Sequence, residues 1–349
     1  MSPSGSGGAR KPPTLVDVAR LAGVSVSTAG RALREPDNKV DPDLAARVMV
    51  AAGELGYMPN VAARSLRSGG GAMVGLVVGE MVDPYYGEIA EIVTETAERD
   101  HSMVAIVSNM QRDALLELKH IERLCGHRVS GLILAGGGFD QWSYFDRFIH
   151  LMAIAARSGV AVTSLAPRGT DIPTFCVDNE LVGELCATRL LEAGHRRIGI
   201  LLGPPHSEVT QQRLRGLTKT LADAGAGFVV DHVPYTPEAG EKAVQQMIGR
   251  VPELTAFIAG TDTMGVGVLS GLVRAGRTVP TDASVISIGN TRLATWASPN
   301  LTTVDLAIAD YARGALNHIA AHVNGAEPPP PPTTLPTVIE GGTVAPPPD

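Results

Sequence analysis

Seven apolar runs of about six residues recur between Met73 and Gly289, and they constrain the fold more than any other feature of the chain. The runs are MVGLVV, MVAIVS, GLILAG, VAVTSL, RIGILLG, LTAFIAG and SVISIG. Helical stretches separate most of them, at residues 85–99, 114–124, 181–193, 211–224, 239–251 and 264–275. Continuous apolar strands that alternate with helices are typical of parallel sheets covered on both faces. The sequence therefore predicts a doubly wound α/β architecture from about residue 72 onwards.

A helical period replaces this alternation in residues 14–33. Apolar residues there recur at i, i+3, i+4 and i+7, between a possible N-cap at Thr14 and a possible C-cap at Gly23. Ser25 can cap a second helix, whose inward face would carry Val24, Thr28, Ala29 and Ala32. Its outward face would carry Val26, Ser27, Gly30, Arg31 and Arg34. Small side chains beside an arginine allow close approach to a DNA groove, but an ordinary helical hairpin has the same pattern.

The segment after this helix pair favours the DNA-binding interpretation. A third helix is predicted over residues 42–55, and GYMPNVAARSLRSGG follows at residues 56–70. The arrangement closely resembles the N-terminal headpiece of the LacI/GalR (lactose/galactose repressor) family of bacterial transcription regulators. The family pattern T-x-x-D-V-A-x-x-A-G-V-S-x-x-T-x-x-R-x-L is met over residues 14–33, and its companion G-Y-x-P-N-x-x-A-R-x-L over residues 56–66. One departure is Gly30, which stands where the family usually has a serine that contacts DNA.

Four motifs in the α/β region also recur in the effector domain of this family. They are VDN at residues 177–179, GHRRIG at 194–199, R-x-x-G at 213–216 and LTTV at 301–304. The resemblance implies a two-lobed α/β domain, similar to periplasmic sugar-binding proteins, with the effector between the lobes. An all-α helix-turn-helix headpiece would precede these two doubly wound parallel sheets.

From these patterns we expect a division of the chain into five parts. Residues 1–12 form a disordered tail, residues 13–58 the DNA-binding headpiece, and residues 59–71 a hinge helix and linker. The N-lobe of the effector domain takes residues 72–164 and 292–325, and the C-lobe takes residues 165–291 and 326–345.

Two segments of the effector domain stand apart from the alternating pattern. Residues 136–158 are expected to form a long loop with Trp142, Tyr144 and Phe145, which could cover the cleft or form a subunit contact. Prolines 328–332 are expected to form a rigid connector before a last strand at residues 335–340.

The DNA contacts that the resemblance implies lie in the headpiece and the hinge. The second helix would enter the major groove, where Arg31 can read guanine, while hydroxyl groups hold phosphates. Leu66 matches a leucine that wedges between base steps of the minor groove in this family. The predicted partner is a double-stranded, pseudo-palindromic operator bound by a homodimer. The predicted DNA-binding residues are Thr14, Ser25, Val26, Ser27, Thr28, Arg31, Arg34, Tyr57, Asn60, Ala63 and Leu66.

The effector pocket is expected where the apolar runs end, because ligands of parallel α/β sheets bind at the carboxyl ends of the strands. Aromatic rings, one arginine, one carboxylate and several hydroxyl or amide groups follow those runs. Such a lining suits a sugar, a sugar acid or a similar small molecule. The predicted effector-binding residues are Tyr85, Tyr86, Ser207, Arg213, Tyr235, Asp262 and Asn290. Most of the family represses, so a repressor is expected, although linkage allows the ligand to weaken or to strengthen DNA binding.

The charge of the chain supports this division once it is followed along the sequence. The formal net charge is −7, which by itself argues against binding to nucleic acid. Residues 1–68, however, hold nine Lys and Arg against six Asp and Glu, so this part carries +3 and the remainder −10. A basic head on an acidic body suits a protein of which only the head touches phosphate.

Catalytic and cofactor chemistry has little support in the sequence. Nucleotide-binding, zinc-protease and nucleophile-elbow patterns are absent, namely G-x-G-x-x-G, G-x-x-x-x-G-K-[ST], H-E-x-x-H and G-x-S-x-G. We therefore expect no enzyme activity, no cofactor and no metal, and His195 in the GHRRIG turn is expected to be a helix-end partner. The alternative function is a cytoplasmic small-molecule binding protein without a DNA role.

The remaining features concern location and assembly. The apolar runs are far shorter than the roughly 20 residues of a membrane span, and no signal peptide is visible. Cys125, Cys176 and Cys186 are expected to be buried thiols in a reducing compartment. A cytoplasmic, nucleoid-associated protein is therefore expected. Leucine heptads are absent from the C-terminal segment, which argues against a coiled-coil tetramerisation tail.

Overall fold

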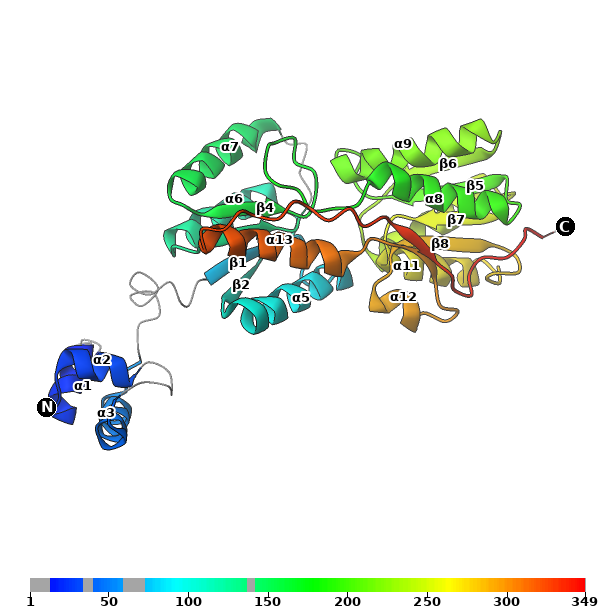
Figure 1. The fold of residues 1–349 in the computed structure, drawn as a ribbon. Helices are drawn as coiled ribbons and strands as arrows, with labels where there is room; N and C mark the ends of the chain where they lie inside the picture. The colour runs from blue at the N-terminus through cyan, green and yellow to red at the C-terminus, as the bar shows by residue number, and fades with distance from the viewer. Residues whose placement is uncertain (1–12, 34–39, 59–72, 137–141, 349) are drawn as a thin grey trace, which may run out of the picture. The chain divides into compact units, whose positions relative to one another are not determined.

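The computed structural model describes residues 13–33, 40–58, 73–136 and 142–348 (Figure 1). Contacts divide the chain into two compact units, Met1–Gly71 and Ala72–Asp349. The predicted tail at residues 1–12 and the predicted hinge and linker at residues 59–71 lie outside the described residues.

The described part of the first unit contains the three predicted helices of the headpiece: α1 Leu15–Ala22, α2 Val26–Ala32 and α3 Pro42–Leu55. A capping box begins α1, in which Thr14 Oγ1 accepts from the backbone N–H of Asp17 and the Asp17 carboxylate accepts from the N–H of Thr14. Ser25 Oγ caps α2 by accepting from the N–H of Thr28 at 3.0 Å. Gly23 ends α1 at φ 65°, a left-handed conformation that glycine adopts without strain.

Small apolar side chains fill the core between these helices. Alanines make up most of this set, so the helices approach one another closely. The buried residues are Val18, Ala19, Ala22, Ala29, Val48, Ala51 and Ala52.

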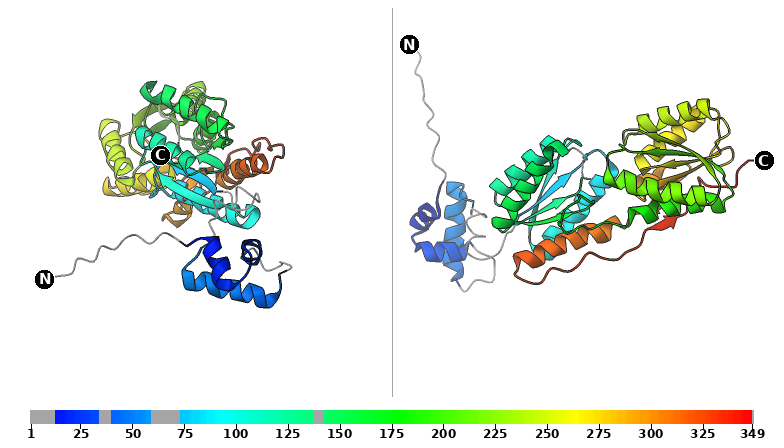
Figure 2. Two further views of the ribbon diagram at one scale, coloured as in Figure 1. Left: turned by 90° about the vertical axis from the view of Figure 1, so that its left-hand side faces the viewer. Right: turned by 90° about the horizontal axis from the view of Figure 1, so that it is seen from above.

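The second unit consists of two lobes, each built on a sheet that helices cover on both faces (Figures 1 and 2). The sheet of the first lobe is parallel, with the strand order β2-β1-β3-β4. Helices α5 and α13 pack on one face of it, and α6 and α7 on the other (Figure 1). The elements of this lobe are β1 Met73–Val78, α5 Pro84–His101, β2 Val104–Asn109, α6 Ala114–Gly126, β3 Gly131–Leu134, α7 Trp142–Arg157, β4 Ala161–Ser164 and α13 Ile308–Val323.

The sheet of the second lobe has the strand order β10-β9-β8-β7-β5-β6, and it is parallel except for β10, which pairs antiparallel with β9. Helices α8 and α9 contribute to the core on one face, and α10 and α11 to the core on the other. The elements of this lobe are α8 Asn179–Glu192, β5 Arg197–Leu202, α9 Glu208–Asp223, β6 Gly227–His232, α10 Pro237–Arg250, β7 Ala256–Ala259, α11 Asp262–Arg274, β8 Ser284–Gly289, α12 Arg292–Trp296, β9 Thr302–Asp305 and β10 Thr337–Ile339.

All seven apolar runs of the sequence form strands, which confirms the predicted doubly wound architecture. The predicted assignment of residues to the two lobes is wrong at two places. Residues 292–305 had been expected in the first lobe, but β9 pairs with both β8 and β10 and therefore lies in the second. Helix α13 returns to the first lobe, where it packs against β3, β4 and α5. Residues 326–334 had been expected in the second lobe, but Pro329 and Thr334 accept hydrogen bonds from α13 and so lie along the first.

The predicted long loop at residues 136–158 is also wrong, because residues 142–157 form helix α7. Phe148, Leu151 and Ala155 recur with helical spacing and are buried against α6 and the sheet. Tyr144 packs against the same core, so this segment completes a lobe rather than covering a cleft.

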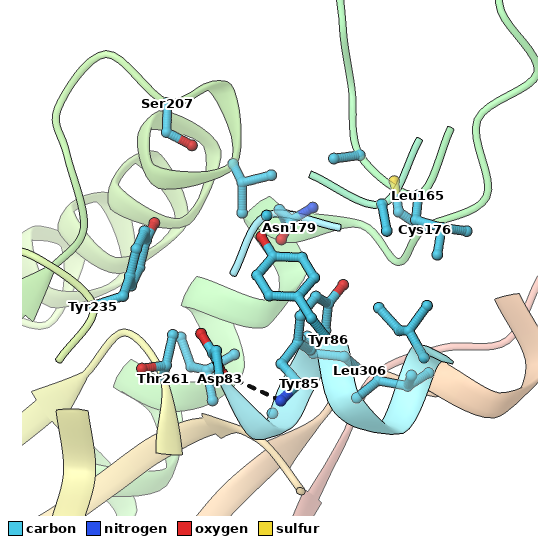
Figure 3. Close-up of a pocket in the computed structure, with 18 of the residues that line it drawn as sticks. Asp83, Tyr85, Tyr86, Leu165, Cys176, Asn179, Ser207, Tyr235, Thr261 and Leu306 are labelled. Carbon is cyan, nitrogen blue, oxygen red and sulfur yellow. Dashed lines mark hydrogen bonds between the residues drawn. The ribbon is translucent and has the colours of Figure 1, made fainter. Parts of the chain in front are cut away.

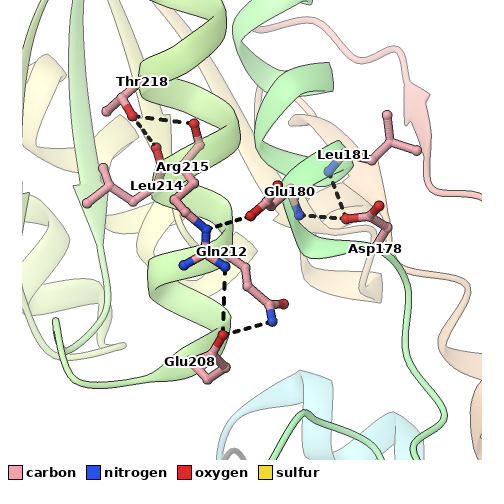
Figure 4. A network of polar contacts seen from close by, with 8 residues as sticks. All are labelled: Asp178, Glu180, Leu181, Glu208, Gln212, Leu214, Arg215 and Thr218. Carbon is pink, nitrogen blue, oxygen red and sulfur yellow. Dashed lines mark hydrogen bonds and ion pairs between the residues drawn. The ribbon is translucent and has the colours of Figure 1, made fainter.

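Glycines allow α8 and α9 to cross at the distance of backbone contact. A Cβ at Gly183 would lie 2.2 Å from the carbonyl oxygen of Arg213, and a Cβ at Gly216 would lie 2.0 Å from that of Glu180. Figure 4 shows the polar contacts around this crossing, where Arg215 pairs with Glu180 at 2.5 Å. The crossing brings the first turn of α8 beside the middle of α9.

Candidate DNA interface and ligand pocket

The headpiece exposes the N-terminal turn and one face of α2. Ser25, Val26, Ser27 and Arg31 are all exposed, and Val26 keeps 44% of its surface accessible although it is apolar. An apolar side chain left on the surface next to hydroxyls and an arginine is the composition that a major-groove helix uses to contact base edges.

Other predicted DNA contacts have roles inside the headpiece as well. Thr14 is exposed and its hydroxyl bonds the Asp17 carboxylate at 2.7 Å. Thr28 is half-buried and shares a hydrogen bond of 2.8 Å with Ser25, and Tyr57 packs against the headpiece core. A hydroxyl group binds phosphate by donating its O–H, so Thr14 would have to exchange its Asp17 acceptor for a phosphate oxygen. The predicted residues Arg34, Asn60, Ala63 and Leu66 lie outside the described residues.

Gly30 departs from its predicted place on the outward face of α2. It is half-buried, and a Cβ built on it would lie 3.4 Å from Cδ2 of Leu15 on α1. The position therefore faces the neighbouring helix, where a Cβ would make an ordinary contact with Leu15.

A cavity of about 420 Å³ lies between the two lobes, at the carboxyl ends of their strands. Figure 3 shows side chains from both lobes around it, among them Asp83 and Tyr86 from the first and Tyr235 and Thr261 from the second. Six of the seven predicted effector-binding residues line it: Tyr85, Tyr86, Ser207, Arg213, Tyr235 and Asp262. The seventh, Asn290, is not among its lining residues, and its backbone N–H donates to Thr303 Oγ1. Its neighbours Gly289 and Thr291 line the cavity instead.

Arg213 is a buried cation that the helix crossing positions. Its Nε donates to Asn179 Oδ1 and its Nη1 to the carbonyl oxygen of Gly260, both at 3.0 Å. Both acceptors are neutral, and no carboxylate among the described residues forms an ion pair with this guanidinium, which is only 8% exposed. A guanidinium has five N–H donors, so Arg213 can offer further donors to oxygen atoms of a ligand.

Two motifs of the sequence acquire their physical meaning here. In VDN, Asp178 caps α8 and Asn179 holds Arg213. In R-x-x-G, Gly216 permits the close approach of α9 to α8 that brings Arg213 within reach of Asn179.

Asp262 is almost fully buried and its carboxylate accepts four hydrogen bonds from the protein. Oδ1 accepts from the hydroxyls of Ser287 at 2.6 Å and Thr303 at 2.7 Å. Oδ2 accepts from the N–H and the hydroxyl of Thr291, at 2.7 and 2.9 Å. A carboxylate has about four lone-pair sites, so these hydrogen bonds occupy all of its acceptor sites. Asp262 therefore ties together the ends of β7, β8 and β9 beneath the pocket.

The sequence had not identified Asp83 and Arg112, which form an ion pair in the pocket wall. Arg112 Nη2 lies 2.9 Å from Asp83 Oδ2, and Asp83 Oδ1 caps α5 by accepting from the N–H of Tyr85. Arg112 follows the carboxyl end of β2, so the rule that ligand-binding residues follow strand ends could have found it. Burial raises the pKa of Asp83, and the adjacent Arg112 opposes that shift.

Tyr85 and Tyr86 are neighbouring aromatic side chains in the first-lobe wall of the pocket. Tyr85 and Tyr86 meet edge to face, with ring centroids 5.0 Å apart. Burial raises the pKa of Tyr86 to about 12 and also raises that of Tyr85. Both phenols therefore stay neutral near pH 7 and act as hydrogen-bond partners or ring faces. Burial likewise raises the pKa of Cys176 at the pocket edge, so this thiol stays protonated.

His195 of the GHRRIG motif lies away from the pocket and is not the helix-end partner predicted from the sequence. Its ring is fully buried, with Nδ1 2.9 Å from Thr255 Oγ1 and Nε2 2.9 Å from both Ser284 Oγ and the carbonyl oxygen of Ala345. It thus fastens the C-terminal segment to the sheet of the second lobe.

The described residues give no sign of a metal site or a membrane span. No group of three or more His, Cys, Asp or Glu side chains among them is placed to hold a metal ion. None of the helices that the structure describes combines the length and the apolar character needed to cross a bilayer.

Comparison with known proteins gives matches at both ends of the chain. Residues 14–60 match the model of bacterial regulatory proteins of the lacI family, and residues 187–344 match that of a periplasmic binding protein-like domain. The HTH-type transcriptional repressor CytR of Escherichia coli (strain K12) is 30% identical over 296 residues, which cover 83% of this chain and 84% of CytR.

Solved structures agree with the observed fold. A complex of the transcriptional regulator CelR with cellobiose superimposes with a TM-score of 0.66 and 26% identity, over 95% of this chain and 99% of that one. The Lac repressor dimer bound to operator and the anti-inducer ONPF has a TM-score of 0.79 at 23% identity, over 96% of this chain and 100% of that one. The latter likeness shows the shared fold.

Proposed function

The chain belongs to the LacI family of bacterial regulatory proteins, and we propose that it represses transcription by binding a pseudo-palindromic operator as a homodimer. It is a ligand-responsive, DNA-binding transcriptional regulator with a headpiece for DNA and a two-lobed domain for an effector. The observation that carries the proposal is the presence, in one chain, of a capped helix-turn-helix with an exposed α2 and of a cavity between two lobes.

The DNA-reading part of the proposal rests on α2. Val26, Ser27 and Arg31 would contact base edges, and Thr14, Ser25, Thr28 and Tyr57 would hold phosphates. A two-fold dimer places two such helices on two half-sites, which is why the operator should be pseudo-palindromic. The Lac repressor structure of the same fold is a dimer on its operator, which supports this assembly.

The effector is proposed to be a sugar, a sugar acid or a similar polyol. Apolar and aromatic side chains of the cavity wall can pack against a sugar ring, while Arg213 and Ser207 can bond its hydroxyl or carboxylate oxygens. Ser207 begins α9 without a side-chain capping bond. The regulator CelR, which has the same fold, forms a complex with cellobiose, and this supports the same class of ligand.

The coupling between the two parts is proposed to be thermodynamic. An effector that binds one arrangement of the lobes better than another changes the free energy of DNA binding. A coupling of about 1–3 kcal/mol would change operator occupancy roughly 5- to 150-fold. We place this activity in the cytoplasm at the nucleoid and assign no catalytic step to the pocket.

A mobility-shift experiment with the full chain tests the function. Double-stranded DNA with randomised half-sites is incubated with the protein, and bound sequences are recovered and sequenced. A pseudo-palindromic consensus supports the proposal. If no DNA is retained, with or without sugars, the chain is a small-molecule binding protein and the regulator assignment fails.

A further inference from the structure

Arg112 occupies a slot between two tyrosine rings of the pocket. Its guanidinium carbon lies 4.7 Å from the ring centroid of Tyr235 in the second lobe and 5.6 Å from that of Tyr86 in the first. A planar guanidinium stacks on aromatic faces through cation–π attraction. The side chain therefore links the two lobes across the cavity.

The two walls of this slot are fixed by glycines at strand ends. A Cβ at Gly79, directly after β1, would lie 2.5 Å from the ring of Tyr86. A Cβ at Gly203, directly after β5, would lie 1.9 Å from the ring of Tyr235. The Tyr235 hydroxyl is held as well, 2.9 Å from Thr210 Oγ1. Each ring therefore lies directly against the backbone at a strand end, where only glycine leaves room for it.

Arg112 is anchored through both its side chain and its backbone. Asp83 pairs with it at 2.9 Å, and that carboxylate is only 6% exposed. The backbone N–H of Arg112 donates to the carbonyl oxygen of Gly79 at 2.8 Å, and its φ is 53°, in the left-handed region. Withdrawal of Arg112 would leave a buried carboxylate without its partner, which is costly.

Aromatic rings stack at centroid separations of about 4.5–7 Å, which includes the spacing that Arg112 keeps from both tyrosines. A flat ring and the guanidinium therefore compete for one space. We propose that Arg112 determines specificity by filling this slot and so prevents flat aromatic ligands, such as nucleobases, from stacking between Tyr86 and Tyr235. The inference rests on the proposed function of the cavity as effector site. It selects, among the candidate effectors, non-aromatic polyols and sugar acids that lie beside Arg112.

Isothermal titration calorimetry on the full chain tests this inference, with adenine and adenosine as flat probes and cellobiose and gluconate as non-aromatic ones. The wild-type protein should bind neither flat probe at concentrations up to about 1 mM. Arg112→Ala empties the slot, so adenine should bind with a Kd of about 0.1 mM or lower, at least tenfold below the wild-type limit of about 1 mM, because stacking on aromatic faces is worth about that much.

A second variant guards against misfolding. Asp83→Asn combined with Arg112→Ala removes the buried charge together with its partner, while an amide oxygen can still accept from the Tyr85 N–H. It should gain adenine binding as well. Arg147→Ala is the matched control, because Arg147 lies in the same lobe in an exposed ion pair with Glu122 and outside the pocket. It should behave as the wild type.

Two results would overturn the inference. One is that the wild type binds adenine as tightly as Arg112→Ala does. The other is that Arg112→Ala and the double variant are folded but bind adenine no more tightly than the wild type. DNA binding by the same preparations separates this inference from the proposed function. If the wild type binds no DNA, the proposed function as a regulator is refuted. The result for ligand binding at the slot is unaffected.

Discussion

The Nε–H of Arg213 donates to Oδ1 of Asn179 at 3.0 Å, and this bond joins the middle of α9 to the first residue of α8. It holds a buried guanidinium in the pocket wall, and two of the five N–H groups of this side chain are committed to Asn179 and Gly260. Arg213 therefore has further N–H groups that it can donate to a ligand in the pocket.

Replacement of Arg213 by alanine should abolish the effector response while DNA binding persists. Hydrogen bonds from a charged group are worth about 1.5–3 kcal/mol each, so ligand affinity should fall at least tenfold. Isothermal titration calorimetry, with the ligand identified for the wild type, measures the loss of ligand affinity. A mobility shift measures DNA binding. Arg215→Ala is the matched control, since Arg215 lies on the same helix, is 53% exposed and pairs with Glu180 outside the cavity (Figure 4). Equal loss of ligand affinity in both variants would argue against the assigned role of Arg213.

Gly216→Ala should destabilise the second unit, because the new Cβ would lie 2.0 Å from a backbone oxygen of α8. Overpacking of this kind costs about 1–3 kcal/mol in the free energy of unfolding. Urea denaturation followed by circular dichroism measures it. Gly249→Ala on α10 is the control: it has nothing within 4 Å of its new Cβ and should raise stability by about 0.5–1 kcal/mol. Similar stabilities for the two variants would show that α8 and α9 do not touch at Gly216.

Much of the second unit could be predicted because its central strands are continuous apolar runs, which only a sheet covered on both faces accommodates. Two strands escaped prediction for physical reasons. The edge strand β6 is half-exposed and ends in Asp231-His232, and β9 is a four-residue strand in which two threonines replace aliphatic side chains. Helix α7 was missed although Phe148, Leu151 and Ala155 have helical spacing, because the glycines before it indicated a loop.

The pocket was predicted in part. The strand ends identify which loops converge, but they do not show which side chains contact or hydrogen-bond one another. Arg112 lies three residues after β2, and nothing local indicates that it stacks on Tyr235. Two of the hydrogen bonds that the Asp262 carboxylate accepts come from Thr303, 41 residues away, and from Ser287, 25 residues away. Such contacts follow from the register of β7, β8 and β9, which no sequence period encodes.

Stability of the second unit should fall as the pH falls, through His195. Burial lowers the pKa of this imidazole below its ordinary value of 6.5. The unfolded chain therefore binds a proton more readily than the folded one, so stability is fully present above that ordinary value and is lost as the pH falls below it. Thermal unfolding recorded between about pH 5 and 8 should show this decline. In His195→Gln the decline should be shallower and the midpoint at high pH lower. If the thermal stability of His195→Gln falls with pH as steeply as that of the wild type, another group is responsible for the pH dependence.

Arg31→Ala should relax base preference at one position of each half-site, at a cost of about 1–3 kcal/mol in specific binding. Arg31 is exposed on α2 beside Ser27, where a bidentate contact to guanine is possible. Selection from randomised operators, compared between the variant and the wild type, measures the preference. A uniform loss of affinity across all sequences would show that Arg31 holds phosphate instead.

Gly30→Ala should stabilise the headpiece and leave operator affinity almost unchanged. Its new Cβ would meet Leu15 Cδ2 at 3.4 Å, an ordinary contact, and alanine in a helix interior is favoured over glycine by about 0.5–1 kcal/mol. Hydrogen exchange at the amides of α1 to α3 measures this gain. Gly53→Ala on α3, with nothing within 4 Å of its new Cβ, should give a similar gain and serves as the control. Because position 30 faces α1, operator affinity of the Gly30 variant should stay within about twofold of the wild type. A tenfold loss in Gly30→Ala but not in Gly53→Ala would mean that position 30 does face the DNA groove, where the absence of a side chain would set the operator preference.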